Sequence, residues 1–198
     1  MAKLIMICGL PGTGKTTIAR QIVSKNHSYV VHSLDEVRKD LGFTAYDEKR
    51  NFLAFIEFNY RMVASLKKGS NVIADTNFTT EQLRREIYEI AKYYQFEFMV
   101  VECISNDQIA KERIQRRGVN YALMPQYTET NVPAVFDRLK ARWEPIDVEF
   151  LKKNSFGFLR LDTENKQVLK QVDPVFDVFQ TMNEESSKLV INVPEDLI

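Results

Sequence analysis

Residues 9–16, with the sequence GLPGTGKT, carry the most specific chemical signal in the chain. The spacing of their glycines, lysine and threonine matches a phosphate-binding loop. In such a loop, backbone N–H groups and the dipole of the following helix attract a phosphate, and the threonine hydroxyl binds Mg²⁺. The sequence therefore predicts a site for ATP and Mg²⁺, with Lys15 taking part in catalysis and Thr16 as a metal ligand. The residues expected to contact the nucleotide are Gly12, Thr13, Gly14, Lys15, Thr16 and Thr17.

Asp35 and Arg38 follow the second predicted strand, where open parallel sheets bind their ligands. They are three residues apart, so they share one face of a helical turn. A carboxylate in this place can accept a proton from an attacking hydroxyl, and the arginine can hold an anionic group of the acceptor. The alternative is that Asp35 only caps a helix and that Arg38 is solvated.

Asp75, Thr76 and Asn77 follow the strand predicted beside the phosphate loop. An acidic residue at such a strand end often holds the Mg²⁺ shell, directly or through water. We therefore predict Asp75 as a metal ligand or as a residue that positions the acceptor. Thr76 and Asn77 would supply neutral hydrogen bonds to the acceptor, or they would form a turn with an Asx cap.

Arg113, Arg116 and Arg117 are spaced so that they can share one face of a helix. Phosphoryl transfer places negative charge on the equatorial oxygens of the migrating group, and a mobile lid that carries arginines can neutralise it. We predict such a lid over about residues 113–131. The alternative is a solvated basic face that ends at Gly118.

The pattern of strands and helices that must position these residues alternates along the chain, which predicts an α/β protein. The expected fold is a P-loop kinase domain of the adenylate-kinase-like kind over residues 1–183, with a tail over 184–198. Its parallel sheet would have helices on both faces and an arginine-bearing lid. The strands are expected at 4–8, 29–32, 71–75, 96–103 and 156–161, and a final helix at 172–182.

A longer helix is expected over about residues 47–68, where Phe52, Ile56, Val63 and Leu66 form an apolar stripe. We predict that this stripe packs in the core. The predicted strands also contain the two cysteines, Cys8 and Cys103, which read as small core residues in a reducing compartment.

Composition limits the possible partners. The 198 residues include 27 Lys and Arg and 27 Asp and Glu, so the net charge is zero and any contact with nucleic acid must rest on a local cluster. No apolar run reaches the length of a membrane span, and the N-terminal apolar stretch reads as a strand rather than a signal peptide. We expect a cytoplasmic protein with no membrane partner, and the sequence leaves its oligomeric state open.

Taken in order, these elements resemble the kinase domain of phage-type polynucleotide 5′-hydroxyl kinases over most of the first 130 residues. The similarity rests on the phosphate loop, on Asp35 to Arg38, on Asp75-Thr76-Asn77 with Arg84-Arg85 following, and on Arg117-Gly118. The resemblance implies a phosphotransferase that moves the γ-phosphate of ATP to the 5′-hydroxyl end of DNA or RNA. The phosphatase signature Asp-x-Asp-Gly of many such enzymes does not occur, so the expectation is a kinase without that domain.

The resemblance also implies a role for each matching residue. Asp35 would be the general base on the 5′-hydroxyl, and Arg38 would bind the phosphodiester beside it. Asp75, Thr76 and Asn77 would line the acceptor side. Arg117, with Arg113 or Arg116, would reach the donor phosphates from the lid.

Two other functions fit parts of the pattern. An Asp followed three residues later by Arg also occurs in adenylylsulfate kinases and zeta-toxin-like kinases, so the acceptor could be a small molecule such as a nucleoside or a sugar nucleotide. The chain could also be a regulatory module that binds ATP without transferring phosphate.

Overall fold

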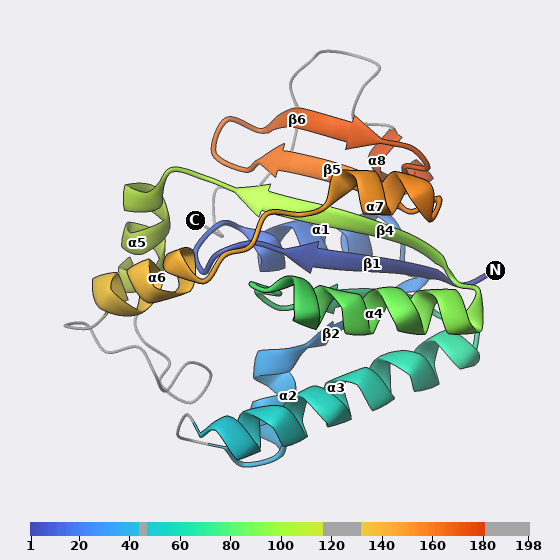
Figure 1. Cartoon of the computed structure of the whole chain (residues 1–198), viewed down its shortest axis with the longest axis horizontal. Coiled ribbons are helices and arrows are strands. Elements are labelled where there is room, and N and C mark those ends of the chain that lie inside the picture. Colours follow the sequence, from blue (N-terminus) through green and yellow to red (C-terminus); the bar gives the residue numbers. More distant parts are fainter. Residues whose placement is uncertain (44–46, 117–131, 181–198) are drawn as a thin grey trace.

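We describe a computed structural model of the chain, which covers residues 1–43, 47–116 and 132–180. Within these ranges one six-stranded sheet runs through the molecule in the order β2-β3-β1-β4-β5-β6 (Figure 1). β1 lies in the middle and pairs in parallel with β3 and β4. The strands are β1 (Lys3–Cys8), β2 (Tyr29–Ser33), β3 (Asn71–Asp75), β4 (Glu97–Ile104), β5 (Gly157–Asp162) and β6 (Gln167–Val172).

Helices cover both faces of the sheet, as predicted, and the two apolar cores lie between them and the strands (Figure 1). α3, α4 and α7 pack on one face, while α1 packs on the other. The described helices are α1 (Lys15–Lys25), α2 (Leu34–Asp40), α3 (Glu48–Lys67), α4 (Glu81–Tyr94), α5 (Asp107–Arg116), α6 (Val132–Ala141), α7 (Val148–Lys153) and α8 (Asp177–Gln180).

The central strands are confirmed close to their predicted bounds because they are continuous apolar runs. Leu4 to Cys8 are fully buried on both faces of the sheet, as expected for a parallel strand between two helix layers. Cys8 and Cys103 are both free and buried. Thr80 caps α4 by accepting a hydrogen bond from the Leu83 backbone N–H.

The helix predicted over 172–182 is confirmed only in part, because among its described residues only Asp177–Gln180 are helical. Residues 167–172 form β6, which was not predicted and which pairs antiparallel with β5. The cause is a tight hairpin, in which the Asp162 carboxylate accepts hydrogen bonds from the Glu164 and Asn165 N–H groups. The hairpin returns the chain as an edge strand, and most of its side chains face solvent.

The predicted core stripe of α3 is half wrong. Phe52 and Ile56 are 64% and 50% exposed, whereas Leu66 is buried and Val63 is half-buried. The core face instead consists of Ala54, Phe55, Phe58, Met62 and Leu66. Because α3 is apolar on two faces, its sequence pattern does not show which of them packs on the sheet.

Other features were not predicted or cannot be compared. α7 was not expected, because it is only six residues long. Residues 117–131 of the predicted lid and the predicted tail over 184–198 lie outside the described residues. Across the part of the chain that is described, no helix has both the length and the apolar character needed to cross a membrane.

Candidate phosphate-binding and acceptor site

The loop between β1 and α1 has the backbone of an anion cradle. Gly12 adopts a φ of +79°, and a Cβ there would lie 2.2 Å from the Ala110 backbone oxygen. Gly14, with a φ of +85°, is the N-cap of α1 and supplies no side-chain cap, and the first turn of α1 has no acidic residue. The N–H groups at this helix end are therefore left for an anion.

Lys15 lies inside the loop rather than in solvent. Its Nζ donates hydrogen bonds to the Gly9 oxygen at 3.0 Å and to the Leu10 oxygen at 2.9 Å. Burial lowers the pKa of Lys15, and the nearby Asp75 carboxylate opposes this shift. The ammonium group is thus held at the cradle by two carbonyl oxygens, which a phosphate oxygen can replace.

Thr16 and Asp75 lie together, as a shared Mg²⁺ site requires. The Thr16 Oγ1 hydroxyl donates to Asp75 Oδ2 at 2.9 Å, and Asp75 is buried at the end of β3. Among the described residues, no group of three or more His, Cys, Asp or Glu side chains could hold a metal by itself. A threonine and one carboxylate fit Mg²⁺, which takes its other ligands from phosphates and water.

Asp35 and Arg38 form a pair on α2. Arg38 Nη1 donates to Asp35 Oδ1 at 2.9 Å, and Arg38 Nη2 donates to Asn51 Oδ1 of α3. Desolvation raises the pKa of Asp35 and the Arg38 charge opposes the shift, although the Asp35 side chain remains 40% exposed. Asp35 comes two residues after Ser33, which pairs with Asp75 across β2 and β3, so the carboxyl lies at the same edge of the sheet as the phosphate loop.

The other residues predicted to contact the nucleotide or the acceptor lie in the phosphate loop and in the turn after β3. The Asn77 backbone oxygen accepts a hydrogen bond from the Gly9 N–H at 3.2 Å, and the Thr76 and Asn77 side chains are half-buried. Thr13 is buried in the loop, whereas Thr17 is exposed on the first turn of α1.

The predicted arginines behave differently from one another. Arg113 Nη1 donates to the Gly12 oxygen at 3.4 Å, so this arginine reaches the loop. Arg116 is 76% exposed and lies 3.9 Å from the Glu112 carboxylate. Arg117 lies outside the described residues.

Three residues that support the site were not predicted to do so from the sequence. Asn51 holds Arg38, and Thr163 donates its hydroxyl to the Thr13 backbone oxygen at 2.8 Å. Arg84, fully buried, donates to the backbone oxygens of Phe78, Glu144 and Pro145. Arg84 thus joins the turn after β3 to the segment after α6, and it has no exposed atom for a ligand.

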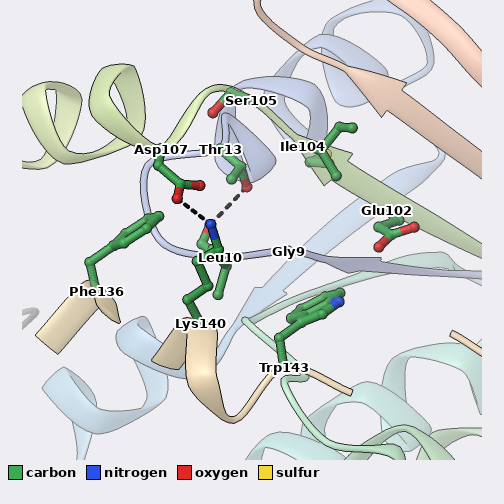
Figure 2. A pocket seen from close by; sticks show the side chains of 11 residues that line it. Gly9, Leu10, Thr13, Glu102, Ile104, Ser105, Asp107, Phe136, Lys140 and Trp143 are labelled. Carbon is green, nitrogen blue, oxygen red and sulfur yellow. Dashed lines mark hydrogen bonds and ion pairs between the residues drawn. The ribbon is translucent and has the colours of Figure 1, made fainter. Parts of the chain in front are cut away.

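A cavity of about 290 Å³ lies beside the phosphate loop (Figure 2). Its walls come from the loop, from the end of β4 and from the region of α6. The lining residues are Gly9, Leu10, Thr13, Glu102, Cys103, Ile104, Ser105, Asp107, Phe136, Lys140 and Trp143.

The comparison with protein families decides the assignment of this chain. Residues 4–146 match the family described as "AAA domain", which is more than half of the chain. The chain belongs to this AAA-domain family. The matched range contains the phosphate loop, Asp35, Arg38 and Asp75, and it ends just before α7.

Solved structures similar to this chain include kinases of several kinds. A provisionally assigned kinase from Chloroflexus aurantiacus has 20% identity and a TM-score of 0.60, covering 74% of this chain and 83% of its own. A fungal RNA kinase has 15% identity and a TM-score of 0.59, covering 90% and 81%. A sugar kinase from Janibacter has 13% identity and a TM-score of 0.56, covering 82% and 86%.

At these identities the likeness establishes the fold, which is that of a P-loop kinase, and not the acceptor.

Proposed function

We propose that this AAA-domain protein transfers the γ-phosphate of ATP to the 5′-hydroxyl of a polynucleotide, with Asp35 as the general base. The observation that carries the proposal is the position of Asp35. It follows Ser33, which pairs with Asp75 at the edge of the sheet beside the phosphate loop, and its carboxylate accepts a hydrogen bond from Arg38. A base at this edge, beside a fixed guanidinium, suits an acceptor hydroxyl that has a phosphodiester next to it.

Asp35 prepares the acceptor for attack. Its carboxylate accepts a hydrogen bond from the hydroxyl and takes the proton as the new P–O bond forms. The raised pKa makes the carboxylate a stronger base than an ordinary aspartate. Arg38, which Asn51 keeps in place, holds the neighbouring phosphodiester and so orients the hydroxyl.

The donor side holds the triphosphate and its charge. ATP would supply the phosphoryl group, and Mg²⁺ held by Thr16 and Asp75 would neutralise part of its charge. Lys15 exchanges the Gly9 and Leu10 oxygens for phosphate oxygens. Arg113 donates a hydrogen bond to the Gly12 oxygen of the phosphate loop. We propose that Arg113 and Arg117 neutralise the charge of the migrating phosphoryl group.

A small-molecule acceptor is the second candidate. The likeness to a sugar kinase supports it, since the fold alone accommodates acceptors of both kinds. The similarity to a fungal RNA kinase favours the polynucleotide, as do Asp75-Thr76-Asn77 and Arg117-Gly118, on which the family resemblance rests.

The test is transfer of labelled γ-phosphate from ATP with Mg²⁺ to 5′-hydroxyl DNA and RNA oligonucleotides. We expect label on the 5′ ends with wild-type protein, and none with Lys15→Ala. Lys25→Ala, an exposed lysine at the other end of α1, is the matched control and should retain activity. If the protein binds ATP but labels no oligonucleotide, the polynucleotide proposal fails. A metabolite screen then separates a small-molecule kinase from a module that transfers nothing.

A further inference from the structure

The cavity beside the phosphate loop lies on the same face of the sheet as Asp35. Phe98 and Val100 of β4 pack in the core that also contains Leu34 and Val37 of α2. Because side chains alternate along a strand, Glu102 points to this same face. The cavity and the acceptor residues therefore lie on one side of the sheet, and α1 lies on the other.

The distance between the two places follows from the strand order. Asp35 follows β2, the cavity lies at β1 and β4, and β3 is between them. Adjacent strands are about 4.8 Å apart, so the cavity lies about 10–14 Å across the sheet from the end of β2. That separation matches a nucleotide of the acceptor strand whose sugar-phosphate end lies at Asp35 and whose base points towards β4.

The walls of the cavity combine aromatic rings with polar groups (Figure 2). Phe136 and Trp143 supply flat apolar surface, and the Arg84 guanidinium lies 5.7 Å from the Trp143 ring centroid and so helps to fix the ring. The wall also contains the buried Glu102 carboxylate, which accepts a hydrogen bond from Arg160 Nε at 2.6 Å. A carboxylate has about four acceptor positions, so this contact uses only part of its capacity.

Ser105 adds a polar group that calls for an explanation. Its Oγ is buried and has no hydrogen-bond partner among the residues that the structure describes. A buried hydroxyl without a partner costs free energy, and a ligand that bonds to it removes that cost. Glu102 can accept hydrogen bonds from the amino and ring N–H groups at the edge of a base, while Trp143 packs against its flat surface. Ser105 lies at the other end of the cavity, where it can bond to the sugar of the same nucleotide (Figure 2).

We propose that this cavity binds a nucleobase of the acceptor strand, packed on Trp143 with its polar edge at Glu102. The cavity of about 290 Å³ is at the lower limit of pockets for small ligands, which begin near 300 Å³. It therefore suits one base with its sugar rather than a whole nucleoside triphosphate. The identity of the molecule that brings the base rests on the proposed function.

The first test uses fluorescence. Trp143 is the only tryptophan of the chain, so its emission reports on the cavity without any need for catalysis. We expect a 5′-hydroxyl trinucleotide to change the emission, and the same molecule without its first two bases to leave it unchanged. No response to any base-containing probe overturns the proposal. A response to ADP with none to the trinucleotide also overturns it, because the cavity would then belong to the donor base.

The second test uses two variants and steady-state kinetics. Trp143→Leu should raise the KM for the base-containing oligonucleotide by about fivefold to a hundredfold. Ser105→Ala, which removes no hydrogen bond seen in the free protein, should leave the unfolding temperature unchanged and raise that KM by about two- to tenfold. The KM for ATP should not move in either variant. Tyr93→Leu, at an aromatic residue that is 80% exposed, is the control.

Two results separate this inference from the proposed function. If Trp143→Leu raises the KM of the abasic oligonucleotide as much as that of the intact one, the base-binding role is wrong although the kinase reaction stands. If wild-type protein labels no oligonucleotide, the proposed function fails. Titration with free nucleosides then tests whether the cavity binds a base. A change in Trp143 emission supports base binding, and no change overturns it.

Discussion

The donor side and the acceptor side of the site are built in different ways. On the donor side the site is formed mainly by backbone groups. Gly12 packs on the Ala110 oxygen, and the Thr163 hydroxyl donates a hydrogen bond to the Thr13 oxygen. On the acceptor side Arg38 is held by two side chains, Asp35 and Asn51, from two different helices. A phosphate cradle made of backbone tolerates few changes, whereas side chains can be exchanged one at a time. We infer that the position of the acceptor hydroxyl is set by residues of α2 and α3.

The largest expected effect is that of Asp35→Asn. The amide keeps the shape of the side chain but cannot take the acceptor proton, so kcat should fall by about 10²–10⁴-fold. The KM for ATP should change little, because the phosphate loop is intact. Steady-state kinetics with both substrates measures this.

Asp40→Asn is the matched control, because Asp40 is at the other end of α2 and pairs with Arg61. A kcat of Asp35→Asn close to that of wild-type protein would sink the assignment of Asp35 as the base. It would also leave the acceptor side without a chemical role.

The next largest effect concerns the backbone of the donor side. In Gly12→Ala the new Cβ must lie 2.2 Å from the Ala110 oxygen, so the loop or α5 has to shift. A displacement of about 1 Å can lower activity by about 10²-fold, and we expect that loss in kcat/KM for ATP. Calorimetric titration with ATP should show correspondingly weaker binding.

Gly69→Ala provides the comparison that isolates packing from backbone strain. Gly69 also has a positive φ, +89°, but no atom lies within 4 Å of its Cβ position. Its variant should lose about 1–2 kcal/mol of stability from the left-handed backbone alone and keep its affinity for ATP. Equal losses of ATP binding in the two variants would contradict the packing argument.

The same contrast explains what could be predicted from the sequence. The phosphate loop is a local structure, in which eight consecutive residues define both conformation and chemistry, and the buried apolar strands around it are equally local. Thr16 and Asp75 are both predicted as Mg²⁺ ligands from their places at the carboxyl ends of parallel strands. In the structure the Thr16 hydroxyl donates a hydrogen bond to Asp75, and their role towards a metal stays a prediction.

The remainder depended on contacts between distant segments. Asn51 is an ordinary residue of a helix until α2 packs beside α3 and brings Arg38 to it. The α3 stripe was misplaced because Phe52 and Phe55 are equally apolar, and only the packing of the helix separates the exposed ring from the buried one. Arg84 belongs to the motif that suggested the family resemblance, yet its contacts are with backbone oxygens of the interior.

A smaller effect tests whether Asn51 positions Arg38. Asn51→Ala removes one hydrogen bond from the guanidinium, so the KM for the acceptor should rise by about two- to tenfold, with less change in kcat. Arg38→Ala should have a larger effect, and the double variant should be no worse than Arg38→Ala. Additive losses would show that Asn51 acts independently, and Lys49→Ala, an exposed neighbour on α3, is the control.

The smallest expected effect is the pH dependence of stability that Asp35 contributes. Its pKa is raised in the folded protein, chiefly by desolvation, so the folded state binds this proton more tightly than the unfolded state does. The stability from Asp35 is therefore fully present below the ordinary pKa of an aspartate and is lost as the pH rises through the folded pKa.

Activity should run in the opposite direction, because only the ionised carboxylate can act as the base. Urea unfolding across this pH range, with Asp35→Asn subtracted from wild-type protein, measures the first trend, and the acid limb of kcat/KM measures the second. A stability difference that grows with pH would mean that the Arg38 charge outweighs desolvation, and the acceptor side would then be a stabilised ion pair rather than a carboxylate kept ready to take a proton.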